Sequence, residues 1–359
     1  MPKIVSYIST KFNSVKNALG IKDTTGNPNF SIVKNSSATW YTKDLSEKKA
    51  PVLCMRQNIN NGNNIQRLVS TEVLNKLYYD VNSPQYDKNN YRLVPNSRYG
   101  SGIAYCENTL IESNGVLLPA NNVSVNNSPY TTIASQYPLN DKESLKHYFN
   151  MLFDNDIKTV YVLASNNDII KDRSTLLGEY NESDFEKKEF KYFRESLDLG
   201  NIKSNHIEKW NLSKDKANRA CLDAKIYIKL VTKENSDEKK KINFVHIYNW
   251  PDHTAIDATK LRNTIDIIGD NLKINPTKEN IAVHCLAGLG RTGEFIALME
   301  MMKMIEAGNT KTKSLESILV HLRKNRSWQL LKMKVQVNAL INFAINNNIP
   351  LVNNNIEMK

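Results

Sequence analysis

Long apolar runs and patterned cysteines are both missing from this chain of 359 residues. No apolar stretch approaches the length of a membrane-spanning helix. The N-terminus carries Lys3 but lacks the continuous apolar core and the small-residue cleavage site of a signal peptide. Neither metal-ligand nor disulfide-framework spacing relates the four cysteines, Cys54, Cys106, Cys221 and Cys285. We therefore expect no signal peptide, no transmembrane segment and a reducing compartment.

Concentrated basic blocks are also missing, although the net charge is +11 and the pI is about 9.2. The Lys and Arg residues are scattered without interleaved aromatic residues, so we expect no nucleic-acid partner. The charge favours a phosphorylated protein or an anionic membrane surface. Apolar side chains from Ile4 to Leu19 follow helical spacing, which predicts an amphipathic helix over residues 3–21. Within residues 1–22 this helix either binds a secretion chaperone or a membrane surface, or packs on the main domain.

An α/β pattern occupies the rest of the chain. The segments expected as strands are 116–125, 131–135, 159–164, 225–231, 242–248 and 281–284. The segments expected as helices are 67–80, 142–153, 258–272, 291–304, 315–324 (with Ser314 as its N-cap) and 331–346. The predicted fold class is α/β, a twisted mixed β-sheet flanked by helices. We divide the chain into an N-terminal extension of amphipathic helix plus Asn/Lys-rich segment (1–80), a catalytic domain (81–348) and a frayed tail (349–359).

The most informative segment joins the strand at 281–284 to the helix that begins at Arg291. Gly288 and Gly290 let the backbone curl, so that successive N–H groups face one point. The positive end of the helix faces the same point. Cys285 should ionise easily among these dipoles, and Arg291 offers a planar fork for two phosphate oxygens. Together they indicate phosphoryl transfer through a cysteinyl-phosphate intermediate. The loop residues expected to bind the phosphate group of the substrate are Leu286, Ala287, Gly288, Leu289 and Gly290.

A general acid is also needed, because the bridging oxygen of a phosphate ester leaves badly unless it is protonated. Trp250-Pro251-Asp252 directly follows an expected strand and supplies a carboxylate 33 residues before Cys285. On its own this tripeptide is more typical of an ordinary turn, and its place 33 residues before Cys285 is what favours the acid.

Taken together, these segments resemble the cysteine-dependent protein tyrosine phosphatases. His284-Cys285, five residues and then Arg291-Thr292-Gly293 resemble the signature loop of that family. Trp250-Pro251-Asp252 resembles its mobile lid, with Trp250 as anchor, and His253 resembles the residue that often follows. The similarity covers roughly residues 85–345 and is strongest to secreted bacterial effectors of the Yersinia outer-protein and SptP type. It implies hydrolysis of protein phosphotyrosine, with no metal and no other cofactor.

The resemblance also implies roles outside the loop and the lid. Gln336 would position the hydrolytic water, whereas the family's other glutamine falls on Lys332, unless Gln329 replaces it through a shifted loop. Asp168, one methylene shorter than the family's Glu, would fix the guanidinium plane of Arg291. The alternative is an ordinary surface-turn residue.

Four more residues receive expectations from the family pattern. Thr292 would donate its hydroxyl to the thiolate, and His284 would be a hydrogen-bonding scaffold for the loop. Tyr91 would wall the phosphotyrosine slot, or else have no such role. Leu286 stands where the nearest relatives commonly have Arg, so this chain lacks a positive charge at the rim of the active site.

Two other functions stay open from the sequence. One is a phosphotyrosine-binding module with little turnover, favoured by Lys332 and by the shortened Asp168. The other is a dual-specificity or phosphoinositide phosphatase, although the loop lacks the two lysines of the lipid phosphatases. The resemblance further implies a virulence effector that is secreted into the host cytoplasm, where its partners are tyrosine-phosphorylated proteins.

Overall fold

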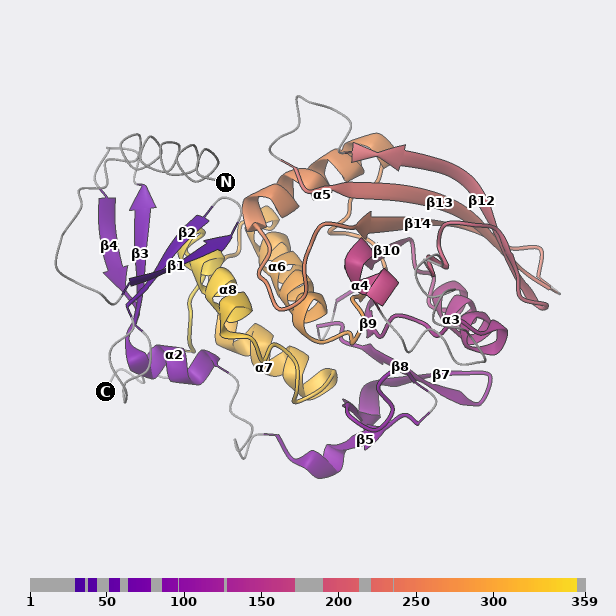
Figure 1. Cartoon of the computed structure of the whole chain (residues 1–359), viewed down its shortest axis with the longest axis horizontal. Coiled ribbons are helices and arrows are strands. Elements are labelled where there is room, and N and C mark those ends of the chain that lie inside the picture. Colours follow the sequence, from indigo (N-terminus) through magenta and orange to yellow (C-terminus); the bar gives the residue numbers. More distant parts are fainter. Residues whose placement is uncertain are drawn as a thin grey trace, which may run out of the picture.

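The computed structural model describes residues 30–35, 38–43, 52–58, 64–78, 86–95, 97–125, 128–171, 190–212, 221–234 and 236–353. A nine-stranded twisted sheet is its largest element (Figure 1). Four parallel strands form the centre, in the spatial order β14 (Lys239–Ile247), β10 (Thr159–Val162), β15 (Ile281–His284) and β9 (Thr132–Ser135). Antiparallel strands extend both sides: β13 (Ala224–Lys233), β12 (Ile202–Asn211) and β11 (Leu197–Asp198) beyond β14, and β8 (Val116–Asn122) and β7 (Leu110–Ser113) beyond β9.

Helices cover both faces of this sheet, so the central strands β9, β10 and β15 are buried along their whole length. In β15, Ile281 and Val283 face one core cluster and Ala282 faces the other, because successive side chains alternate. The first cluster is completed by α5 (Ala258–Leu272), α6 (Gly290–Glu306), α7 (Leu315–Asn325) and α8 (Lys334–Asn346). The second is completed by α3 (Lys142–Asp154). The predicted fold class, a twisted mixed sheet flanked by helices, is confirmed.

Smaller elements complete the description. A two-stranded antiparallel sheet consists of β5 (Tyr91–Leu93) and β6 (Ala104–Cys106), and short 3-10 turns occupy Lys88–Asn90 and Glu107–Thr109. The short helix α4 (Asn166–Lys171) follows β10. Four antiparallel strands lie in the predicted extension, namely β1 (Phe30–Asn35), β2 (Ala38–Lys43), β3 (Val52–Asn58) and β4 (Asn64–Leu68).

Several expected boundaries agree closely with the structure. Helix α5 spans residues 258–272 as predicted, and the Ser314 hydroxyl accepts the N–H of Ser317 at 3.0 Å, which makes it the N-cap of α7. The sequence did not predict β12, because most of its side chains are exposed and its pairing with β13 depends on backbone hydrogen bonds.

Residues beyond both predicted boundaries of the catalytic domain pack against it. The helix α2 (Thr71–Leu77) buries Leu74 and Leu77 completely, and the Leu77 carbonyl accepts a hydrogen bond from Arg323 at 3.1 Å. At the other end, the carbonyl of Pro350 accepts the N–H of Leu315 at 2.8 Å, so the predicted tail is held to α7 at least to this point. The predicted helix 3–21 and residues 354–359 lie outside the described residues.

Candidate active site

The segment predicted to bind phosphate, named the phosphate-binding loop after that prediction (residues 285–291), joins β15 to α6 at the carboxyl end of the parallel strands. Cys285 directly follows the strand and is only 3% exposed. Its Sγ accepts the N–H of Gly288 at 3.2 Å, and its own N–H donates to Thr292 Oγ1 at 2.9 Å. Because α6 begins within the loop, its positive end favours negative charge there. The donation from the Thr292 hydroxyl to the sulfur remains a prediction.

Gly288 has a backbone conformation that only glycine adopts without strain, with φ of +69°. A Cβ built at this position would collide with the carbonyl oxygen of Ser135 and approach Arg326 NH2 to 2.7 Å. The carbonyl of Gly288 also accepts a hydrogen bond from Arg326 Nε at 3.2 Å. The curled path of the loop is therefore fixed by close packing against β9 and a buried arginine.

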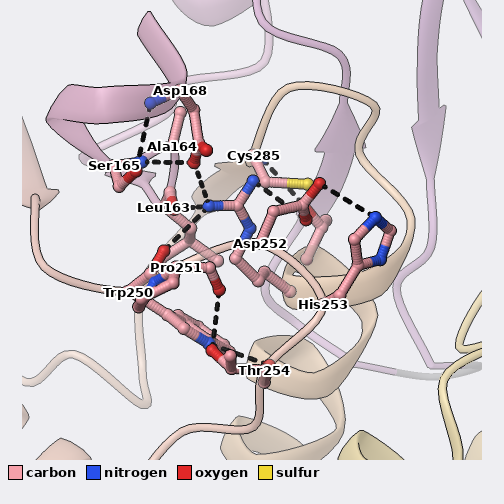
Figure 2. A network of polar contacts seen from close by, with 12 residues as sticks. Leu163, Ala164, Ser165, Asp168, Trp250, Pro251, Asp252, His253, Thr254 and Cys285 are labelled. Atoms are coloured by element: carbon pink, nitrogen blue, oxygen red, sulfur yellow. Dashed lines mark hydrogen bonds and ion pairs between the residues drawn. The ribbon is translucent and has the colours of Figure 1, made fainter.

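Arg291 lies at the other end of the loop and is 1% exposed. Its NH1 donates to three oxygens, those of the Leu163 carbonyl at 3.2 Å, Asp168 Oδ2 at 2.5 Å and the Trp250 carbonyl at 2.9 Å (Figure 2). Its NH2 lies 3.2 Å from Asp252 Oδ1. Among the described residues the buried Nε has no hydrogen-bond partner, which leaves this N–H for the oxygen of an anion.

Charge neutralisation keeps this buried guanidinium protonated. Burial acts to lower the pKa of Arg291, but the charges of Cys285, Asp252 and Asp168 outweigh it and the net pKa is raised. Burial likewise acts to raise the pKa of Asp168, but Arg291 outweighs it and the net pKa is lowered. Asp168 itself is oriented by the Ser165 N–H, which donates to its Oδ2 at 2.9 Å. The structure thus places Asp168 against Arg291 from the first turn of α4.

The segment that carries the predicted general acid Asp252, named the acid loop after that prediction (residues 250–256), follows β14 and the two-residue turn at its end. Trp250 is buried, and its indole Nε1 donates to the Thr254 carbonyl at 3.1 Å. The Thr254 hydroxyl donates in turn to the carbonyl of Pro251 at 2.7 Å. These two bonds close the segment into a tight turn, and Asp252 within it lies beside the guanidinium of Arg291 (Figure 2).

Asp252 and His253 lie on the solvent side of the acid loop. The Asp252 side chain is 49% exposed and that of His253 is 72% exposed, with its backbone at φ of +59°. His253 Nε2 lies 3.5 Å from Asp252 Oδ2. One carboxylate oxygen of Asp252 therefore faces Arg291 and the other faces His253.

A model of the protein-tyrosine phosphatase family matches residues 85–346, which include this loop, this arginine and this carboxylate. The chain belongs to the protein-tyrosine phosphatase family.

Curated relatives extend the match. Tyrosine-protein phosphatase YopH of Yersinia enterocolitica is 28% identical over 267 residues, which are 70% of this chain and 50% of YopH. The secreted effector protein SptP of Salmonella paratyphi A is 22% identical over 231 residues, which are 61% of this chain and 36% of SptP. The chain thus spans about half the length of the first curated relatives it matches.

Solved structures show the same fold at lower identity. The Trypanosoma brucei protein tyrosine phosphatase TbPTP1 superposes with a TM-score of 0.55 at 18% identity, over 77% of this chain and 90% of that one. PTPN18 in complex with HER2-pY1248 phosphopeptides gives a TM-score of 0.53 at 17% identity, over 71% and 88% of the two chains.

His284 sits beneath the loop of this phosphatase domain and is fully buried. Its Nδ1 lies 3.1 Å from the Cys285 carbonyl oxygen and its Nε2 lies 2.6 Å from the Tyr192 hydroxyl. Burial lowers the pKa of His284 to about 3, so the ring is neutral at pH 7. Since a carbonyl only accepts, Nδ1 carries the hydrogen and Nε2 accepts from Tyr192.

Gln336, in α8, extends its side chain to the phosphate-binding loop. Its Nε2 donates to the Thr254 carbonyl at 3.2 Å, which connects it to the acid loop. Its Oε1 is buried without a partner among the described residues, and a Cβ built on Gly290 would meet that oxygen at 3.0 Å. The free carbonyl therefore lies directly against the phosphate-binding loop.

Two nearby residues are engaged elsewhere. The amide of Gln329 donates to the Gly102 carbonyl at 3.2 Å and accepts from the Ala104 N–H at 3.4 Å. This pairing argues against Gln329 as the replacement for the family's first glutamine. Lys332 is exposed, and its ammonium lies 5.5 Å from the ring centroid of Trp328.

The remaining predicted residues are all partly buried. Tyr91 is half-buried and its hydroxyl donates to the Arg323 carbonyl at 3.1 Å. Leu286 packs against the core cluster on the α3 side, whereas Ala287 and Leu289 pack against a small cluster that includes Tyr105. The roles of all these residues toward a substrate stay predictions.

Nothing in the sequence indicated the structural role of Arg326. Arg326 is fully buried, and besides Gly288 it donates through NH1 to Asn121 Oδ1 at 2.7 Å. Its guanidinium lies over the Tyr105 ring at 4.3 Å. These three partners are far apart in the sequence, so no local pattern could indicate them.

Within the described residues, no group of three or more His, Cys, Asp or Glu side chains is arranged to hold a metal ion. None of the helices in that part of the chain combines the length and apolar character needed to cross a bilayer.

Proposed function

We propose that this chain hydrolyses phosphotyrosine in proteins through a cysteinyl-phosphate intermediate. The observation that carries the proposal is the convergence of Cys285 and Asp252 on the buried guanidinium of Arg291. A nucleophile, an acid and a fixed positive charge at one point are the parts that phosphoryl transfer requires.

In the first step, the loop N–H groups and Arg291 Nε hold the phosphoryl oxygens. The Cys285 thiolate forms a bond to phosphorus while the bond from phosphorus to the tyrosine oxygen breaks. Asp252, protonated for this step, transfers its proton to that oxygen, and tyrosine leaves as the neutral phenol. Arg291 and the helix end stabilise the charge that spreads over the equatorial oxygens in the transition state.

In the second step, water displaces the thiolate. The unpartnered Oε1 of Gln336 lies against the loop and is able to accept a hydrogen bond from that water. The Asp252 carboxylate takes the water's proton as the oxygen bonds to phosphorus and the sulfur–phosphorus bond breaks. Inorganic phosphate and the starting enzyme result.

The substrate class depends on the predicted role of Tyr91, whose ring would wall the phosphotyrosine slot and so favour tyrosine phosphate over serine phosphate. The Tyr91 hydroxyl donates to the Arg323 carbonyl at 3.1 Å, which would hold the ring in place. The relative PTPN18 is described with phosphotyrosine peptides, which supports the same substrate class.

We further propose that the chain acts as a secreted effector on tyrosine-phosphorylated proteins in host cytoplasm, in line with SptP, which is named as a secreted effector. Residues 1–22 would contact a secretion chaperone or a membrane surface. Deleting them should then abolish secretion while turnover of a small aryl phosphate persists. A truncated chain that neither folds nor turns over would assign these residues to the domain core instead.

The test of the reaction is steady-state release of phosphate from a phosphotyrosine peptide in EDTA. Cys285→Ser should abolish release, and Asp252→Ala should reduce kcat by about 10²–10⁴-fold. The matched controls are Cys221→Ser, a half-buried cysteine, and Asp266→Ala, an exposed carboxylate on α5; both should turn over normally. A single stoichiometric burst would favour a phosphotyrosine-trapping module. Faster release from phosphoserine peptides or inositol phosphates would overturn the substrate assignment.

A further inference from the structure

Glu294 is a buried carboxyl group that the proposed catalytic cycle does not use. It lies in α6, three residues after Arg291, and its side chain is fully buried. Its Oε1 accepts the backbone N–H of Ile256 at 2.8 Å. Ile256 is the last residue of the acid loop, so this bond joins the far end of the loop to the helix that carries the phosphate site.

The near end of the acid loop is held by the same helix. Arg291 NH1 donates to the Trp250 carbonyl at 2.9 Å. Residues three apart lie on the same side of a helix, so Arg291 and Glu294 present adjacent groups to the loop. The two bonds hold both ends of a seven-residue segment, and Asp252 lies between them.

We propose that Glu294 is a positioning residue, which holds the acid loop through the Ile256 amide in the geometry that lets Asp252 protonate the leaving oxygen. The inference rests on the proposed phosphotyrosine hydrolysis. Glu294 exchanges no proton with the substrate and no bond to it forms or breaks. Glu294 contributes by keeping Asp252 correctly oriented. Proton transfer is sensitive to this orientation, because a small displacement of a catalytic group lowers the rate by a large factor.

The environment of Glu294 fits a neutral hydrogen-bond acceptor. Burial raises the pKa of Glu294 well above its ordinary value, although the Ile256 N–H acts in the opposite direction. The carbonyl oxygen of a neutral carboxylic acid accepts an N–H as an amide oxygen does. Glutamine should therefore replace Glu294 in this role. Methionine has a similar length but would leave the buried Ile256 N–H without an acceptor.

Two substrates separate positioning from a general structural role. A phosphotyrosine peptide has a basic leaving group that needs the proton from Asp252, whereas a difluorinated coumarin phosphate has an acidic one that leaves without it. Glu294→Met should lower kcat on phosphotyrosine by about 10–100-fold, and on the coumarin phosphate by less than about threefold. Glu294→Gln should stay within about threefold of the unmodified chain on both.

A second background tests whether Glu294 acts through Asp252. In an Asp252→Ala chain, adding Glu294→Met should cause little further loss, because the group being positioned is already absent. Glu300→Gln is the matched control, since Glu300 lies on the same helix, is also buried and pairs with Lys303 at 2.8 Å instead of with the acid loop. It should leave both substrates unaffected.

Several results would overturn the inference. These are equal losses on the two substrates, a Gln variant as impaired as the Met variant, or full additivity with Asp252→Ala. If Glu294→Met does not fold, amide hydrogen exchange in the unmodified chain decides: an Ile256 amide that exchanges as fast as an unprotected one contradicts the bond. Failure of the unmodified chain to release phosphate would instead refute the proposed function, so the two failures are distinguishable.

Discussion

The two loops that meet at the active site are held in opposite ways. The phosphate-binding loop is buried and its path is dictated by backbone packing, since Gly288 touches β9 and Arg326. The acid loop is half exposed and is held by a few hydrogen bonds at Trp250, Thr254 and Ile256. The first loop must not move, because it presents preformed N–H groups to developing charge. The middle of the second loop is exposed and has few contacts to break on moving, whereas its ends at Trp250 and Ile256 are buried in the core.

Apart from the proposed acid Asp252 itself, this difference predicts that changes in the phosphate-binding loop cost much more activity than changes in the exposed part of the acid loop. Among residues that do not take part in the proposed bond-making steps, the largest effect should come from Gly288→Ala, which combines a positive φ with a collision against the Ser135 carbonyl. We expect kcat/KM to fall at least about a hundredfold, since the loop must shift. Gly115→Ala is the control, because Gly115 also has positive φ (+79°) but open space around its Cβ position. It should cost only about 1 kcal/mol of stability and no activity. Similar kinetics for the two variants would mean that packing at Gly288 does not matter.

A smaller effect is expected where a charge supports the buried arginine. Asp168→Asn keeps an oxygen acceptor for Arg291 but removes its charge, and a charge-assisted hydrogen bond exceeds a neutral one by about 1 kcal/mol. We therefore expect kcat/KM on a phosphotyrosine peptide to fall about fivefold to tenfold. Asp156→Asn, which breaks an exposed ion pair with Lys158, should have no effect. Unchanged kinetics for Asp168→Asn would show that Arg291 is oriented by the carbonyl oxygens alone.

The buried contact beneath the acid loop should appear in the pH dependence of stability. Burial raises the folded-state pKa of Glu294, so its contribution is full below the ordinary value of 4.5 and is lost as the pH rises through the folded value. The Glu294→Gln variant does not lose this stability as the pH rises, because its amide does not ionise. Between about pH 5 and pH 8 its Tm should rise relative to the unmodified chain by at least about 2 °C. A Tm difference that stays constant with pH would mean that Glu294 titrates normally.

The smallest effect is expected at the exposed side of the acid loop. His253 makes only a 3.5 Å approach to Asp252 and is largely in solvent. His253→Ala should change kcat by less than about threefold between pH 5 and 8, because an exposed pair contributes little. A loss comparable to that of Gly288→Ala would show that both loops are equally constrained.

The contrast between the loops also explains what the sequence could reveal. One continuous segment between a strand and a helix contains Cys285, the loop glycines and Arg291. Their spacing along the chain was therefore enough to predict how they lie relative to one another. Helix α5 and the Ser314 cap were likewise readable from local patterns. Asp168 and Gln336 were reached only through the resemblance, because they approach the loop from α4 and α8.

Other features could not be predicted from local patterns. The bonds from Arg326 to Gly288 and from Glu294 to Ile256 join residues 38 apart in each case, and nothing in either local sequence indicates the partner. Glu294 precedes a run of apolar residues in α6, which gives a weak signal, since it predicts only that a buried carboxyl needs a partner. Strand β12 was missed because its exposed side chains carry no alternating pattern.

The most direct test of the account is to find where the phosphoryl group resides during turnover. The chain would be mixed with an aryl phosphate, quenched in acid within milliseconds and analysed by peptide mass spectrometry. The account predicts a phosphoryl group on Cys285, formed in the unmodified chain and absent in Cys285→Ser. Turnover that continues with no phosphoryl group on Cys285, or with one on another residue, would contradict it.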